Sequence, residues 1–107
     1  MIAVPDISVQ ELEALRKANA DFLLLDVRNQ DEYDLCNLGG YLIPFAMLAD
    51  RLSELNKEQH IIIHCHAGGR SRRATELLLQ HGFKNVQNLR GGITAWANEI
   101  DPTMVKY

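Results

Sequence analysis

The residues best suited to chemistry lie together in the stretch HIIIHCHAGGRSRRATELLLQHG, residues 60–82. An apolar run ends at Cys65, a loop with two glycines follows, and a helical pattern begins directly after Arg70. Gly68 and Gly69 can adopt positive φ, so successive backbone N–H groups can turn toward one point. The next helix adds its unpaired N–H groups and the positive end of its dipole. The loop therefore predicts a cradle for an anion, such as a cysteine thiolate or the terminal sulfur of a persulfide.

The length of this loop separates two chemistries. The pattern from Cys65 to Arg70 is Cys-x4-Arg. Cysteine phosphatases hold a phosphate in a Cys-x5-Arg loop, and a loop shorter by one residue fits a single sulfur atom better. A phosphatase also needs a general acid for the leaving alcohol, and the spacing of Asp26, Asp31 and Glu32 singles out none of them. The loop favours sulfur transfer, with a small cysteine phosphatase and a non-catalytic interaction domain as alternatives.

The elements that must position the loop alternate between strands and helices. Short apolar runs predict strands at 22–27, 39–45, 60–65 and 83–89, and helical spacing predicts helices at 8–19, 48–55, 71–81 and from 91 onward. Ser8 and Glu11 fit a capping box for the first helix. This alternation indicates βαβ units and a mostly parallel sheet in one α/β domain, residues 1–107. Ligands bind beyond the carboxyl ends of such strands, which is where Cys65 falls.

Composition excludes several classes of protein. Hydrophobic residues make up 47% of the chain and charged residues 23%, as in ordinary globular domains. The net charge of -3 argues against nucleic acid as a partner. No apolar run reaches the roughly 18 residues of a membrane span, and the first ten residues lack the features of a signal peptide. We therefore expect a cytoplasmic protein with no membrane association.

The remaining cysteine and the histidines have simpler interpretations. Cys36 could resolve a Cys65 persulfide as a disulfide, but we favour a packed thiol in a loop. His60, His64 and His66 lie near Cys65 and raise the question of zinc. In an extended strand, however, His64 and His66 point one way and Cys65 the other, and no second ligand pair has zinc spacing. We expect neither a metal nor a cofactor.

Asp26 and Arg28 end a strand at the same edge of the sheet as Cys65. They could line or brace the pocket, and a structural ion pair is the interpretation we favour. Gly91 and Gly92 lack the lysine and spacing of a phosphate loop, so we interpret them as a tight turn into the last helix that could flank the pocket.

On these residues the chain resembles the rhodanese-like sulfurtransferases. The matching segments are LLLDVRNQDEY (23–33), HCHAGGRS (64–71) and HGFKNVQNLRGGITAW (81–96), together with the helix between the last two. The resemblance implies a single-domain, five-stranded, mostly parallel sheet with helices on both faces. It also implies sulfur transfer through a persulfide on Cys65, with Arg70 stabilising charge and pinning the loop. The residues implied to hold the sulfur are His66, Ala67, Gly68, Gly69 and Ser71.

One segment departs from the common pattern of that family. Many members carry a Gly-His-Ile-type segment, whereas this chain has CNLGGYLIP (36–44), with Asn37 at the histidine position. This segment and the ending WANEIDPTMVKY (96–107) resemble rhodanese domains fused behind adenylyltransferases of molybdopterin and thiamine biosynthesis. The implied donor is thiosulfate or a protein persulfide. The implied acceptors are cyanide, small thiols or a sulfur-carrier protein, including a ubiquitin-like carrier served by a separate adenylating enzyme.

Overall fold

The computed structural model describes residues 3–107 and contains a five-stranded sheet in which every strand pair is parallel. The strand order is β1-β5-β4-β2-β3. The strands are β1 (Asp6–Ile7), β2 (Leu23–Asp26), β3 (Tyr41–Leu42), β4 (Ile61–His64) and β5 (Val86–Leu89). Helices connect successive strands, as parallel pairing requires. The α/β class predicted from the alternation is confirmed.

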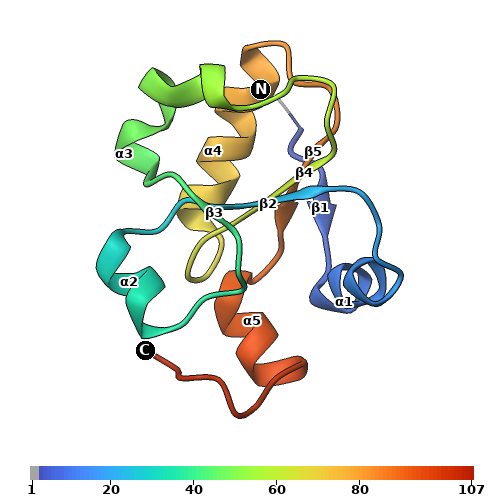
Figure 1. The fold of residues 1–107 in the computed structure, drawn as a ribbon, viewed down its shortest axis with the longest axis vertical. Helices are drawn as coiled ribbons and strands as arrows, with labels where there is room; N and C mark the ends of the chain where they lie inside the picture. Colours follow the sequence, from blue (N-terminus) through green and yellow to red (C-terminus); the bar gives the residue numbers. More distant parts are fainter. Residues whose placement is uncertain (1–2) are drawn as a thin grey trace.

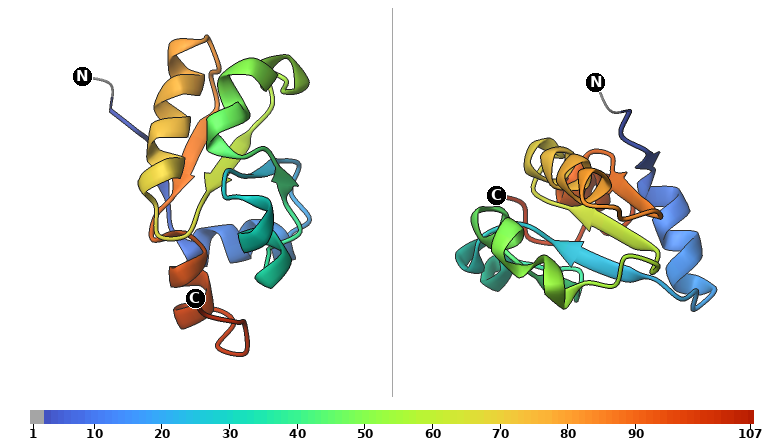
Figure 2. Two further views of the ribbon diagram at one scale, coloured as in Figure 1. Left: turned by 90° about the vertical axis from the view of Figure 1, so that its left-hand side faces the viewer. Right: turned by 90° about the horizontal axis from the view of Figure 1, so that it is seen from above.

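Helices cover both faces of the sheet (Figure 1). They are α1 (Val9–Lys17), α2 (Gln30–Leu35), α3 (Phe45–Leu48), the 3₁₀ helix η1 (Ala49–Glu54), α4 (Gly69–Gln80) and α5 (Gly92–Glu99). One apolar cluster joins one face of the sheet to α3 and α4, and a second joins the other face to α1 and α5. Figure 2 shows the sheet between these layers from two further directions. Because both faces are covered, β4 is buried at all four positions.

The first helix begins as its sequence predicts. The backbone N–H of Glu11 donates to the Ser8 hydroxyl at 3.1 Å, and the N–H of Ser8 donates to the Glu11 carboxylate at 3.0 Å. This is the expected capping box, which satisfies two N–H groups that the helix leaves unpaired. No helix among residues 3–107 is long and apolar enough to cross a membrane.

Several boundaries differ from the predicted ones. The strand β1 was not predicted, because its two residues carry no pattern of their own and pair only with β5, Asp6 opposite Asn88. The strand expected at 39–45 shrinks to β3, because Pro44 directly precedes α3. The helix expected at 48–55 is α3 followed by η1, with a non-helical residue at Arg51. The helix expected from Ser71 begins earlier, at Gly69.

The candidate site lies at the carboxyl ends of β2 and β4. Asp26 and His64, the last residues of these strands, are register partners. The N–H of Val27 donates to the His64 carbonyl at 3.0 Å, which extends the pairing past the strand ends. The loops that leave these two strands therefore start side by side.

Candidate active site

Cys65 lies directly after β4 and is only 1% exposed. Its side chain belongs to the apolar cluster beneath α4. Its carbonyl accepts a hydrogen bond from the N–H of Ile93 at 3.0 Å, and the His66 carbonyl accepts one from the N–H of Thr94 at 3.0 Å. The first turn of α5 therefore fixes the backbone at the start of the loop.

Gly92 is the residue that permits this close approach. A Cβ atom at this position would lie 2.5 Å from the His66 carbonyl oxygen and 2.7 Å from that of Cys65. Its φ of 60° also lies in the left-handed region that favours glycine. Gly92, the first residue of α5, therefore lies against the backbone at the start of the loop.

Two groups lie within hydrogen-bond distance of the Cys65 sulfur. The N–H of Gly68 lies 3.1 Å from Sγ, and the Ser71 hydroxyl lies 3.3 Å from it. Gly68 has a φ of 118° and occupies the N-cap of α4, which turns its N–H back toward the sulfur. Within the described part of the chain, the amides of His66, Ala67, Gly69 and Arg70 make no hydrogen bond to Sγ. The loop holds the resting sulfur with one amide and one hydroxyl.

Ser71 connects the sulfur to a buried polar chain. Its hydroxyl lies 2.6 Å from Asn88 Oδ1 and 3.2 Å from the Gly68 carbonyl oxygen, in addition to the contact with Cys65. Asn88 in turn donates to Asp6 at 3.2 Å. A hydroxyl carries one proton, so Ser71 donates to one of its three neighbours at a time. The proton of Ser71 is therefore available to a negative charge on the sulfur by a rotation of the hydroxyl.

Arg70 closes the loop through Glu32 of α2. Its two terminal nitrogens donate to the two carboxylate oxygens at 2.7 and 2.8 Å. This bidentate pair lowers the pKa of Glu32 to about 2, with smaller support from the N–H of Asn29 and from Tyr107. Glu32 is therefore ionised at neutral pH and cannot supply the proton that a phosphatase needs. In this structure Arg70 pins the loop to α2.

Asp26 and Arg28 form the expected ion pair, and both are completely buried. Arg28 also donates to the carbonyl oxygens of Glu32 at 3.2 Å and Cys36 at 2.8 Å. The guanidinium thus ties the end of β2 to the middle of α2 and to Cys36, the residue that follows the helix. This network braces the helix that carries the partner of Arg70.

His64 is buried beside this ion pair. Its Nε2 lies 3.6 Å from Asp26 and has no hydrogen-bond partner among the described residues. Burial is the main reason that the pKa of His64 falls to about 4, and Arg28 lowers the pKa further while Asp26 opposes the shift. His64 is therefore neutral at physiological pH.

Tyr107 reaches the same region from the segment that follows α5. Its ring stacks on His66, with the centroids 4.0 Å apart. Its hydroxyl donates to Glu32 at 2.9 Å and accepts from Arg28 at 3.0 Å. Burial and the Glu32 carboxylate raise the pKa of Tyr107 to about 12, against the opposing effect of Arg28. Tyr107 is thus a neutral donor beside the loop.

The two cysteines occupy different cores. Cys36 is half-buried and packs against the cluster beneath α1 and α5, whereas Cys65 belongs to the cluster beneath α4. Both are free thiols. Among residues 3–107, no three His, Cys, Asp or Glu side chains are grouped so that they could hold a metal ion.

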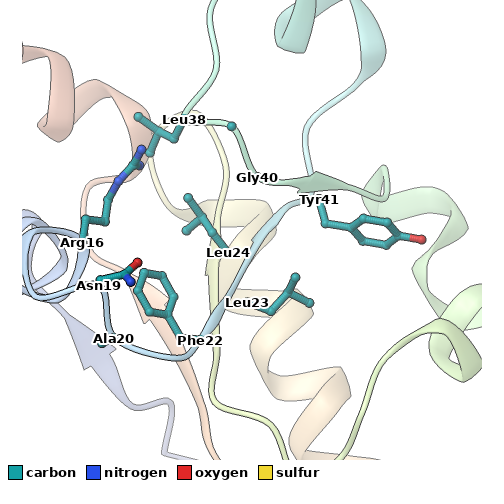
Figure 3. Close-up of a pocket in the computed structure, with 10 residues that line it drawn as sticks. Arg16, Asn19, Ala20, Phe22, Leu23, Leu24, Leu38, Gly40 and Tyr41 are labelled. Carbon is teal, nitrogen blue, oxygen red and sulfur yellow. The ribbon is translucent and has the colours of Figure 1, made fainter.

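One cavity lies away from the loop. Its volume is about 520 Å³, and it is lined by residues of α1, the start of β2 and the segment before β3. In Figure 3 the Arg16 side chain extends toward Leu38, while Tyr41 points away from them. No residue of the Cys65–Arg70 loop lines this cavity. A smaller cavity of about 210 Å³ adjoins the loop at His66 and is bounded by α5 and by residues 105–107.

Comparison with known proteins assigns the family. Residues 8–99 match the rhodanese-like domain family. The chain therefore belongs to this family. Its resemblance to rhodanese domains, first noted from the loop and flanking segments, is confirmed.

Two curated relatives and one solved structure illustrate the match. A sulfurtransferase from Allochromatium vinosum is 37% identical and shares 88% of this chain and 89% of its own length. The probable adenylyltransferase/sulfurtransferase MoeZ from Mycobacterium tuberculosis is 32% identical over 94% of this chain and 26% of its own length. The crystal structure of SSP1007 from Staphylococcus saprophyticus has a TM-score of 0.83 and 30% identity, over 91% of this chain and 97% of that one. Several other curated relatives extend well beyond the match, since the chain spans between 23% and 54% of their length.

Three contributors to the site were not predicted from sequence. Glu32 was considered only as a proton donor, and its pairing with Arg70 joins residues 38 positions apart. Asn88 gives a weak indication of a role in the site, because it is a polar residue near the apolar end of a strand. Tyr107 carries none, because its contacts depend on how the segment after α5 returns to the sheet.

Proposed function

We propose that this chain transfers a sulfane sulfur through a persulfide on Cys65. The observation that carries the proposal is the placement of the Cys65 sulfur between the Gly68 amide and the Ser71 hydroxyl in a chain of the rhodanese-like family. Both groups donate hydrogen bonds, which stabilise a thiolate. Their position at the carboxyl edge of a parallel sheet is typical of ligand sites.

The first half-reaction loads the sulfur. The Cys65 thiolate attacks the outer sulfur of thiosulfate or of a protein persulfide, a new S–S bond forms, and the donor S–S bond breaks. Sulfite or the donor thiolate leaves with the electron pair. The product is a Cys65 persulfide whose terminal sulfur is anionic. No external oxidant or reductant is needed.

The second half-reaction unloads it. A nucleophilic acceptor such as cyanide or a thiolate attacks the terminal sulfur, and the S–S bond to Cys65 breaks. The Cys65 thiolate leaves with the electron pair, so the enzyme returns to its starting state. The hydrogen bonds from Gly68 and Ser71 make the thiolate a better leaving group and a weaker nucleophile. They assist unloading more than loading.

The remaining residues have supporting roles in this proposal. The terminal sulfur of the persulfide takes the amides of His66, Ala67, Gly69 and Arg70, which the resting sulfur does not engage, as its partners. The Arg70 guanidinium stabilises the anionic sulfur at longer range while Glu32 holds it in place. Asp26 and Arg28 act as a brace and do not contact the sulfur.

The donor and acceptor belong to the same proposal. Thiosulfate or a protein persulfide supplies the sulfur, and a thiol, cyanide or a sulfur-carrier protein removes it in the cytoplasm. One proposed acceptor is a ubiquitin-like carrier served by an adenylating enzyme. The name of the relative MoeZ, which combines adenylyltransferase and sulfurtransferase, supports the link to adenylation, and the relative YrkF, named a putative sulfur carrier protein, supports the link to a carrier.

The test is a transfer assay with matched cysteine variants. Wild type, Cys65→Ser and Cys36→Ser are incubated with thiosulfate and cyanide, and thiocyanate is measured. We expect turnover by wild type and Cys36→Ser and none above background by Cys65→Ser. Equal thiocyanate production by Cys65→Ser would overturn the proposal. Hydrolysis of an aryl phosphate that Cys65→Ser abolishes would favour a phosphatase instead.

A further inference from the structure

The Tyr107 side chain connects the two ends of the Cys65–Arg70 loop. Its ring stacks on His66, the first residue after the cysteine, with an angle of 13° between the ring planes. Its hydroxyl donates to the carboxylate of Glu32, which also holds Arg70 at the far end of the loop. Figure 1 shows the end of the chain returning from α5 to lie beside α2. Tyr107 therefore contacts the loop at His66 and is connected to Arg70 through Glu32.

This bridge coincides with a buried nucleophile. Cys65 stands at the sheet edge where ligands approach, yet only 1% of it is exposed. Attack on a donor requires that the donor sulfur reach Sγ. A group near the loop must therefore move or admit only narrow molecules. Tyr107 is a candidate because it contacts His66 directly and is connected to Arg70 through Glu32.

The attachment of Tyr107 is suited to movement. The residue is 39% exposed, and residues 105–107 form one wall of the cavity of about 210 Å³ that separates them from part of α5. No backbone hydrogen bond holds these three residues to the rest of the described chain. One ring stack with His66 and two side-chain hydrogen bonds, with Glu32 and Arg28, therefore hold Tyr107 beside the loop. We call this arrangement the closed position, and these few contacts attach it only weakly.

We propose that Tyr107 determines specificity at Cys65 by acting as a gate that admits small sulfur donors and reagents and slows bulky ones. Insofar as it concerns sulfur donors, this inference rests on the sulfurtransferase function proposed above. Opening requires the ring to leave His66 and the hydroxyl to leave Glu32 and Arg28. A narrow donor such as thiosulfate passes with a small displacement. A protein persulfide or a large thiol derivative requires the fully open position.

The test measures access to Cys65 without requiring sulfur transfer. Second-order rate constants of alkylation by iodoacetamide, a small reagent, and by fluorescein maleimide, a bulky one, are measured for Cys65 by peptide mass spectrometry. Cys36 in the same samples serves as an internal reference. The variants are Tyr107→Ala, which removes the ring, and Tyr107→Phe, which keeps the ring and removes the hydroxyl. Tyr41→Ala is the matched control, since Tyr41 is also an exposed tyrosine bonded to a glutamate but contacts no loop residue.

We expect the ratio of bulky to small rate constants at Cys65 to rise about tenfold in Tyr107→Ala, because the closed position is lost. Tyr107→Phe should fall between this variant and wild type, and Tyr41→Ala should match wild type. An unchanged ratio in Tyr107→Ala, with thermal unfolding like that of wild type, would overturn the gate. A failure of persulfide formation with every donor would overturn the proposed function and leave the alkylation ratios intact.

Discussion

Gly92→Ala is the substitution for which the structure makes the sharpest prediction. The added Cβ would lie 2.5 Å from the His66 carbonyl oxygen and 2.7 Å from the Cys65 carbonyl oxygen. Neither oxygen can move freely, because Thr94 and Ile93 hold them in hydrogen bonds. The overlap therefore either opens these bonds or shifts the start of the active loop.

The expected loss has two parts. An alanine in the left-handed region costs about 1–2 kcal/mol, and overpacking of a closely packed site costs about 1–3 kcal/mol. We therefore expect Gly92→Ala to lower the free energy of unfolding by about 2–5 kcal/mol, a large part of the stability of a typical domain.

Substitutions at two other glycines separate the cost of backbone strain from the cost of overpacking. Gly39 has a φ of 75°, and a Cβ added there would meet nothing within 4 Å, so Gly39→Ala should cost about 1 kcal/mol from backbone strain alone. Gly69 lies in α4 without a positive φ and also meets nothing within 4 Å, so Gly69→Ala should be neutral or stabilising by up to about 1 kcal/mol. Urea unfolding followed by the fluorescence of Trp96, the only tryptophan, measures all three variants. A loss in Gly92→Ala no greater than that in Gly39→Ala would refute the steric reasoning.

Three further substitutions test the surroundings of the sulfur. Ser71→Ala removes the hydroxyl 3.3 Å from Sγ and should slow the discharge of the Cys65 persulfide by cyanide about tenfold in single-turnover experiments, because the leaving thiolate loses a hydrogen bond and such bonds to charged groups are worth about 1.5–3 kcal/mol; an unchanged rate would exclude this role. Glu32→Gln should cost about 1–2 kcal/mol of stability at pH 6, after allowing for solvent screening of Arg70. The folded pKa of Glu32 is lowered to about 2, so its contribution to the free energy of unfolding is complete above the unfolded pKa of 4.5 and is lost as the pH falls through 2. The difference in unfolding free energy between wild type and Glu32→Gln should therefore be smaller at about pH 3 than at about pH 6. The folded pKa of His64, about 4, lies below the unfolded value of 6.5, so its contribution to the free energy of unfolding is complete above pH 6.5 and declines as the pH falls toward 4. Wild type should therefore lose about 2 kcal/mol of unfolding free energy between pH 7 and pH 5, and His64→Asn should not show this loss. Parallel pH profiles of unfolding free energy for wild type and His64→Asn would contradict this.

The local features of this fold are readable from the sequence. The capping box of Ser8 and Glu11 is a contact between residues three positions apart, so its pattern survives without knowledge of the fold. The same holds for the cysteine at the end of an isoleucine-rich strand and for the glycines that follow it. The loop directly follows the strand in the chain. The rule that ligands bind at the carboxyl edges of parallel sheets then predicts where the candidate site lies.

Features that depend on distant contacts escaped prediction. The strand β1 exists because Asp6 and Ile7 find partners on β5, and two isolated residues have no periodicity of their own. The bond between Arg70 and Glu32 depends on the placement of α2, and the role of Tyr107 depends on the path of the segment after α5. In each case the chain supplies suitable side chains, and only the fold selects which of them meet.

The measurement that tests the central claim most directly is the intact mass of the protein after incubation with thiosulfate or a persulfide donor, without reductant. We predict a gain of one sulfur atom, about 32 Da, on wild type and on Cys36→Ser, and its reversal by cyanide. Cys65→Ser should show no gain. The absence of this added mass on wild type across several donors, or its presence on Cys65→Ser, would contradict sulfur transfer through Cys65.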